Sequence, residues 1–330
     1  MLKYILKRLG LSVLILLGVS LIIYVLIRCM PVSFIDDKIA QMNQGGATIP
    51  QETIDSMKAM YGLEDDSFAG ILKGYGNWLV ALCRFDFGTS FKYGAPVLKV
   101  IRDNMGVSFA VAFIATIFEF LIAIPLGITA ATHQYSVVDY VVTVIVMIGI
   151  SLPSFFFGQL LKDLFAMKLG WFPPSGLIDA TVDLSFFGRL VDYIRHLFIP
   201  IMTVVILSIG GRMRMTRTNM LEVLNSDYIR TARAKGLKEK VVIYKHAFRN
   251  TLIPLVTSLA GLLPSLFSGA IITEQVFDLP GIGNKAYQAM IAADIPFIMG
   301  YNMFLALLSV IGVLLADLMY AVVDPRVKLK

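Results

Sequence analysis

The stretch NSDYIRTARAKGLKEKVVIYKHAFRNTLIP, residues 225–254, is basic and hydrophilic but lies between two apolar runs, and we call it the basic segment. Its first part predicts a short helix that is capped by Asp227. The last turn of this helix carries Arg233 and Lys235, where positive charge is favourable. Gly236 follows and is expected to take a left-handed conformation that lets the chain reverse. The basic segment is therefore predicted to be structured.

Beyond the glycine, residues 238–250 predict a second helix, which leads into an apolar run near Pro254. The short first helix is thus expected to lie across one face of a membrane, joined at both ends to membrane helices. This arrangement suits a protein that is moved by a partner on the cytoplasmic side.

The composition indicates a polytopic, all-α membrane protein. Of 330 residues, 57% are hydrophobic and 16% are charged, and the mean hydropathy is +0.75. Soluble domains carry about 25% charged residues. Stretches long enough, or nearly so, to cross a hydrocarbon layer of ~30 Å are residues 9–27, 105–132, 140–161, 197–211, 250–273 and 295–316.

The basic residues predict the orientation. Three precede the first span, ten lie within residues 212–249 and three lie in the C-terminal tail, out of 29 in the chain. All of them fall on the cytoplasmic side only if residues 197–211, a short run that contains Pro200, also form a span. We therefore expect six transmembrane helices with both termini cytoplasmic. The net charge of +6 follows from this topology and gives no support for nucleic-acid binding.

The chain is expected to divide into an N-terminal transmembrane helix (1–30), an extracytoplasmic insert (31–104) and a core (105–330). The core would hold five transmembrane helices and a cytoplasmic loop over residues 212–250. The insert includes an amphipathic stretch over residues 51–63. The two cysteines, Cys29 and Cys83, are too few for a disulfide framework and are expected to be unpaired.

The sequence predicts no enzymatic activity. It contains no G-x-x-x-x-G-K-[ST] loop for a nucleotide phosphate and no G-x-S-x-G motif. Its histidines, His133, His196 and His246, lie far apart and lack metal-ligand spacing. We therefore expect no catalytic residue, no metal site and no cofactor bound by this chain.

The basic segment resembles the ATPase-coupling loop of permease subunits of ATP-binding-cassette (ABC) importers, in particular the dipeptide/oligopeptide branch. The general coupling-loop pattern has Glu-Ala-Ala before its glycine, whereas residues 230–232 are Arg-Thr-Ala here, as is usual in the peptide branch. The matching positions are Tyr228, residues 231–236 (TARAKG), His246, Ala247, Arg249, Asn250 and Pro254.

The resemblance covers nearly the whole chain and implies the type I ABC importer permease fold. Further matches are residues 61–63, 78–79, 86–90, 151–155, 170–176, 277–283 and 324–326. In this family, residues 162–196 and 274–294 would be outer loops. The insert would either cap the outer helix ends or form a surface for a binding protein that delivers substrate, and both roles are compatible.

The resemblance implies the partners and the mechanism. A second, similar permease would complete the path through a prokaryotic cytoplasmic membrane, and two cytoplasmic ATPase subunits would bind ATP and Mg. ATP binding would draw the ATPases together, and the coupling helix would transmit that movement. Tyr228, Ile229 and Ala232 would offer apolar contact, and Arg230 and Arg233 would pair with acidic groups. The coupling residues implied are Asp227, Tyr228, Ile229, Arg230, Ala232, Arg233, Gly236, His246, Arg249, Asn250 and Pro254.

Candidates for the path or gate are few. Glu119 is the acidic residue deep inside a predicted span, so it should face a partner or water. It would either line the path and meet a peptide ammonium or form a helix–helix hydrogen bond to a Ser, a Thr or the partner subunit, and we favour the second. Asp278, Pro280 and Gly281 lie in a predicted outer turn that suits a gate, a contact with the binding protein or a plain tight turn.

The leading hypothesis is a permease subunit of a binding-protein-dependent peptide importer. The same architecture could carry nickel chelates, glutathione or another small solute. From a different class, a stand-alone ion-coupled transporter or channel would need ionisable residues in several spans and would leave the basic segment without a role.

Overall fold

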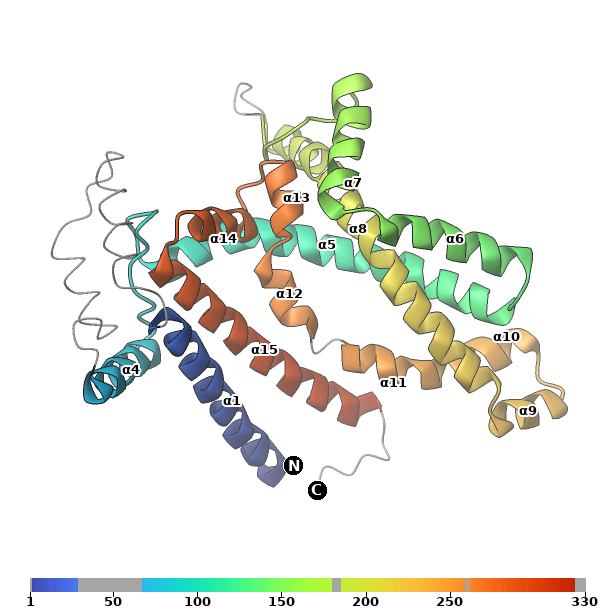
Figure 1. The fold of residues 1–330 in the computed structure, drawn as a ribbon. Coiled ribbons are helices and arrows are strands. Elements are labelled where there is room, and N and C mark those ends of the chain that lie inside the picture. Colours follow the sequence, from blue (N-terminus) through green and yellow to red (C-terminus); the bar gives the residue numbers. More distant parts are fainter. Residues whose placement is uncertain (1, 29–66, 180–184, 259–260, 324–330) are drawn as a thin grey trace. The chain divides into compact units, whose positions relative to one another are not determined.

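The computed structural model of the chain describes residues 2–28, 67–179, 185–258 and 261–323 (Figure 1). In these residues the regular structure is helical, apart from one isolated bridge between Thr89 and Pro96. This confirms the predicted all-α class. The amphipathic stretch over residues 51–63 and Cys29 lie outside the described residues.

The chain forms two compact units, and each is described by itself. Unit 1 contains residues 1–106 and 285–311, and unit 2 contains residues 107–284 and 312–329. Three helices contribute residues to both units: α5 (Val97–Thr132), α14 (Ile282–Ile291) and α15 (Ile295–Val323).

In unit 1, the first predicted span is confirmed as the helix α1 (Leu2–Arg28), and it packs on α4 (Phe68–Cys83) of the insert. Tyr24 of α1 stacks on Trp78 of α4 with ring centroids 6.1 Å apart. The hydroxyls of Ser20 and Tyr75 share a hydrogen bond of 2.9 Å. This part of the insert therefore packs against a membrane helix through aromatic side chains.

The second link within unit 1 is the buried carboxylate of Asp294, just before α15. It accepts hydrogen bonds from the Ser90 hydroxyl and from the backbone N–H groups of Phe91 and Lys92. It also accepts from the backbone N–H of Phe297 in the first turn of α15. One carboxylate therefore caps α15 and fastens the turn of the insert to it.

In unit 2, the predicted span over residues 140–161 is not one straight helix. The helix α6 (Val137–Ser151) is followed by α7 (Ser154–Leu161) and the π-helix η1 (Lys162–Lys168), and the chain bends by 101° between α6 and α7. Pro153 stands at the bend and lacks an N–H group, and it disfavours helical backbone at the residue before it. The expectation of a continuous span is corrected here.

The short predicted span over residues 197–211 is part of a much longer helix, α8 (Phe186–Leu224). Its 39 residues extend for about 58 Å at ~1.5 Å per residue, which exceeds the ~30 Å of a hydrocarbon layer. Residues 186–196 and 212–224, which were predicted to be loop, are therefore helical. Pro200 lies within the helix.

The predicted span over residues 250–273 is broken into α11 (Phe248–Ser258), α12 (Leu262–Ser268) and α13 (Ile271–Val276). Residues 259–260 lie outside the described residues, and Gly269, with φ of +73°, separates α12 from α13. Four described helices are long and apolar enough to span a membrane, or five if the bent pair counts as one. The predicted number of six is therefore not confirmed by helix length alone. The expected outer loop over residues 274–294 is also partly helical, because it contains α14.

Helices α5 and α8 approach closely at Gly127. A Cβ atom at this position would lie 2.7 Å from Thr216 Cβ and 2.8 Å from the backbone oxygen of Met213. Small residues at such crossings let two backbones come together within a membrane.

Replacing Gly127 by alanine is expected to lower the melting temperature of the purified protein. The added methyl would overpack the contact with α8, at a cost of about 1–3 kcal/mol. Gly106→Ala is the matched control, because Gly106 lies in the same helix with nothing within 4 Å of its Cβ position. Equal melting temperatures for the two variants would contradict a tight α5–α8 contact.

Candidate functional site

The first half of the basic segment forms the predicted short helix, α9 (Asp227–Ala234), which follows directly on α8. The predicted cap is corrected: the N-cap residue is Ser226, and Asp227 is the first residue of the helix. The Ser226 hydroxyl donates to the backbone oxygen of Val223, so no side chain caps the helix. Asp227 is almost fully exposed, and its carboxylate oxygen lies 3.7 Å from Arg230 Nη1. Its charge in the first turn suits the helix dipole.

Gly236 has the predicted left-handed conformation, with φ of +73°. Nothing lies within 4 Å of the position that its Cβ would occupy. Glycine is therefore required here by the backbone conformation and not by lack of space.

The second predicted helix is also confirmed, in three joined parts. These are α10 (Glu239–Val241), the π-helix η2 (Val242–Ala247) and α11, which contains Pro254. Across the turn, the Arg233 guanidinium donates to the Glu239 carboxylate at 2.7 Å. This hydrogen bond lowers the pKa of Glu239 and raises that of Arg233. The two helical parts are thus joined by an ion pair as well as by the chain.

The inner face of α9 is packed against its own chain. Ile229 is fully buried and Ala232 is nearly so. Both were predicted to offer apolar contact to a partner, and their burial corrects that prediction. They belong to one hydrophobic cluster with Ile128, Ala131, Met220, Leu224, Val242 and Ala247.

The outer face of the basic segment is formed by other side chains. Tyr228 is 47% exposed, and its hydroxyl accepts a hydrogen bond of 3.0 Å from the Asn250 side chain. Asn250 also donates to the backbone oxygen of His246, which is half-buried. Arg230 and Arg249 are exposed. The exposed apolar side chains that sequence reasoning missed are Leu237, Val241 and Tyr244.

Glu119 of α5 pairs with Arg212 of α8, with 3.0 Å between the carboxylate oxygen and Nε. Arg212 also donates to the Ser258 hydroxyl at the end of α11 and lies over the ring of Phe120. The expected partner of Glu119, a Ser, a Thr or the partner subunit, is corrected: the carboxylate joins two helices through an arginine that was assigned to a loop. A second pair joins α6 to α8, because Asp139 accepts two hydrogen bonds from Arg217.

Residues 277–281 form the turn between α13 and α14, and we call this turn together with the first two residues of α14 (277–283) the Pro-Gly turn. Phe277 and Leu279 are buried in a core that includes Val111 and Val205. Of the three predicted gate residues, Asp278 and Pro280 are exposed and Gly281 is buried. Asp278 has a left-handed backbone with φ of +49°.

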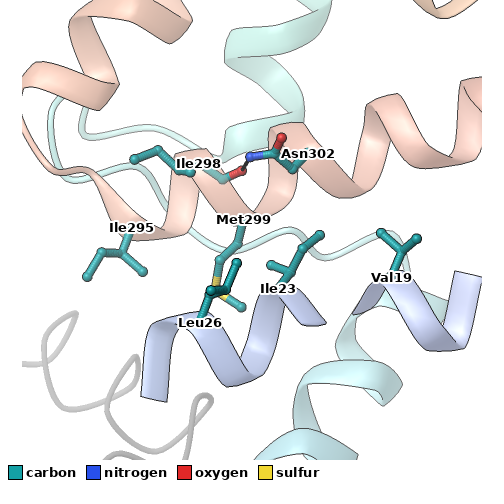
Figure 2. A pocket seen from close by; sticks show the side chains of 7 residues that line it. All are labelled: Val19, Ile23, Leu26, Ile295, Ile298, Met299 and Asn302. Atoms are coloured by element: carbon teal, nitrogen blue, oxygen red, sulfur yellow. Dashed lines mark hydrogen bonds between the residues drawn. The ribbon is translucent and has the colours of Figure 1, made fainter. Parts of the chain in front are cut away.

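An apolar cavity of about 390 Å³ lies in unit 1 between α1 and α15 (Figure 2). The side chain of Met299 reaches from α15 toward Leu26 and Ile23 of α1. Asn302 is the polar member of the lining, and its amide donates to the backbone oxygen of Ile298. No group of three metal-ligating side chains occurs in the described residues.

Comparisons with known proteins agree on one family. Residues 123–329 match the family model described as binding-protein-dependent transport system inner membrane component. The chain is 36% identical over 333 residues to the oligopeptide transport system permease protein AppB of Bacillus subtilis. The alignment covers 99% of this chain and 100% of AppB. It is 33% identical over 342 residues to the dipeptide transport system permease protein DppB of Alkalihalophilus pseudofirmus, with 99% and 100% coverage.

Among solved structures, the chain is similar to one of the MetNI methionine ABC transporter in an inward-facing conformation. The TM-score is 0.54 at 18% identity, and the match covers 68% of this chain and 96% of that chain. This likeness concerns the fold alone.

The Arg233–Glu239 pair predicts a pH dependence. The folded-state pKa of Glu239 is lowered, so the pair stabilises the protein above the unfolded pKa of about 4.3 and loses its effect as the pH falls through the folded pKa. Both side chains are partly exposed, so we expect about 0.2–1 kcal/mol at neutral pH. A double-mutant cycle with Arg233→Gln and Glu239→Gln, measured by thermal unfolding at pH 7 and at an acidic pH that protonates Glu239 in the folded state, checks this. A coupling that persists at the lower pH would contradict the pairing.

Proposed function

We propose that this chain imports short peptides. It belongs to the family of inner membrane components of binding-protein-dependent transport systems, and it is a permease subunit of an ABC importer. The support for a peptide cargo is that relatives at 33–36% identity across nearly the whole chain are named as oligopeptide and dipeptide permeases. Nickel chelates, glutathione or another small solute remain outcomes of the test below.

We propose the partners from the same family membership. A second permease would complete the translocation path, an extracytoplasmic binding protein would deliver the peptide, and two ATPase subunits would hydrolyse ATP with Mg. The chain would lie in a prokaryotic cytoplasmic membrane with both termini inside. The ten basic residues within residues 212–249 support a cytoplasmic position for the basic segment.

The ATPase is proposed to bind the exposed face of the basic segment. Tyr228 and Tyr244 would supply aromatic contact, and Arg230, which is 72% exposed, would pair with an acidic group of the ATPase. Ile229 and Ala232 have a different role in this proposal. Because both are buried against α5, α8 and η2, they would carry the movement of α9 into the permease.

Transmission through α8 follows from its contacts. The end of α8 packs on α9 through Met220 and Leu224. Farther along the helix, Arg217 holds α6 and Arg212 holds α5 and α11. We therefore propose that a displacement of α9 moves these helices together. In this proposal Glu119 joins helices, because its carboxylate already has a cationic partner and would not be free for a peptide ammonium.

The function is tested by reconstituting the complete importer in lipid and measuring ATP hydrolysis against the concentration of binding protein. We expect stimulation when the binding protein is loaded with short peptides and little when it is empty. Stimulation by a nickel chelate or glutathione alone would replace the cargo and keep the architecture. A chain that copurifies with no ATPase would contradict the proposal.

Gly236→Val is expected to uncouple hydrolysis from transport while the protein still inserts into the membrane. A β-branched residue in a left-handed conformation costs about 1–2 kcal/mol, and relief of that strain would reorient α9. We expect peptide uptake to fall about tenfold, which corresponds to ~1.4 kcal/mol.

Gly170→Val is the matched control for this variant. Gly170 is also left-handed, with φ of +63°, and has nothing within 4 Å of its Cβ position, but it lies outside the basic segment. The Gly170→Val variant should lose a similar amount of stability and keep the coupling between ATP hydrolysis and peptide uptake. Equal uptake by the two variants would show that Gly236 has no special role in coupling.

A further inference from the structure

Glu274 is a fully buried carboxylate in α13 that sequence analysis did not single out. One carboxylate oxygen accepts hydrogen bonds from the Ser108 hydroxyl at 2.7 Å and from the Ala270 backbone N–H at 3.1 Å. The other accepts from the Asn284 backbone N–H at 2.8 Å. These donors are neutral and come from three segments of unit 2. A carboxylate buried in this way is costly unless its hydrogen bonds are all made.

The hydrogen bonds of Glu274 hold the Pro-Gly turn at both ends. Ser108 of α5 accepts a hydrogen bond of 2.8 Å from the Ile282 backbone N–H, so the end of the turn is linked to Glu274 through one hydroxyl. At the start, the Leu279 backbone N–H donates to the backbone oxygen of Glu274. The Asn284 amide closes the turn by donating to the backbone oxygen of Leu279.

Three glycines surround the same carboxylate. A Cβ atom at Gly281 would lie 2.3 Å from Glu274 Oε2, and one at Gly283 would lie 2.9 Å from it. At Gly269 the distance to Oε1 would be 2.7 Å. The glycines of this sequence are therefore explained by close approach to a buried charge as well as by turn geometry.

The neighbouring chain fixes the turn further. The Lys162 side chain of η1 donates a hydrogen bond of 2.8 Å to the backbone oxygen of Val276. The Gly176 backbone N–H donates one of 2.9 Å to the backbone oxygen of Phe277. Phe277 and Leu279 anchor the turn in the core. Asp278 and Pro280 alternate with these anchors and are exposed. The turn thus presents one acidic and one rigid apolar group on a backbone that is held from several sides.

We propose that Glu274 is a positioning residue that holds the Pro-Gly turn, so that Asp278 and Pro280 form a preformed docking point for the binding protein. This inference rests on the proposed function, which places the turn on the outer side. A surface that is already ordered avoids the entropy cost of ordering on binding, which favours association. The exposed carboxylate of Asp278 selects a partner that presents a basic group opposite it.

The test is the concentration of peptide-loaded binding protein that gives half-maximal ATP hydrolysis by the reconstituted importer. Asp278→Lys is expected to raise this concentration about tenfold, because it reverses the charge at the docking point. Asp163→Lys is the matched control: Asp163 is an exposed acid of η1, on the same side in the proposed topology, and its reversal should have no such effect.

Glu274→Gln is expected to raise the half-maximal concentration of binding protein and to keep the maximal rate of hydrolysis. The variant places a side-chain N–H against the backbone N–H of Asn284, so this hydrogen bond to the turn is lost. Ser108→Ala, which removes one donor, should do the same to a smaller extent and serves if Glu274→Gln fails to assemble. If Glu274 acts through the turn, Glu274→Gln combined with Asp278→Lys will have less than the product of the two effects.

Four outcomes would overturn the inference. An unchanged half-maximal concentration for Asp278→Lys would remove the docking point. A multiplicative double variant, or a Glu274→Gln variant that lowers only the maximal rate, would leave Glu274 with a purely structural role. If no loaded binding protein stimulates the wild type, the proposed function fails as well, and this result is distinguishable from the other three.

Discussion

Carboxylates that are buried or half-buried must find hydrogen-bond donors within the chain, because burial removes them from water, and the arrangement of unit 2 follows from that constraint. Glu119 and Asp139 meet it with arginines of α8, through Arg212 and Arg217. Glu274 meets it with a hydroxyl and two backbone N–H groups. Each solution joins separate helices or segments. Removing one partner would leave an uncompensated polar group, which is far more costly than losing one exposed ion pair.

The same constraint explains where membrane helices can break. Backbone that leaves a helix needs new partners, and the stretch after α13 has them. The stretch after α13 receives donors from Lys162 and Gly176, while its own N–H groups bond within the turn. Because its backbone is supported in this way, the Pro-Gly turn is a defined structure and not a loose connection. Its exposed residues are consequently available for recognition at little entropic cost.

The basic segment divides its side chains between two tasks. Those that face inward, such as Ile229, are buried with residues of α5 and α8, so the helix α9 is built into the permease. Those that face outward, such as Tyr228 and Arg230, are open to a partner. A coupling element needs both, because a contact that bound an ATPase without being anchored could not transmit movement. The Arg233–Glu239 pair adds a link across the reversal at Gly236.

Much of this protein could be predicted from its sequence, because hydrophobic runs, a left-handed glycine and local helix signals depend on neighbours along the chain. The membrane class, both helices of the basic segment and the conformation of Gly236 were available in this way. Tertiary structure alone decided which face of α9 is buried, that Arg212 reaches Glu119, and that Glu274 organises the turn around Gly281. These features depend on groups far apart in sequence, up to 166 residues for Ser108 and Glu274, and no local pattern records which distant donor will satisfy a buried acid.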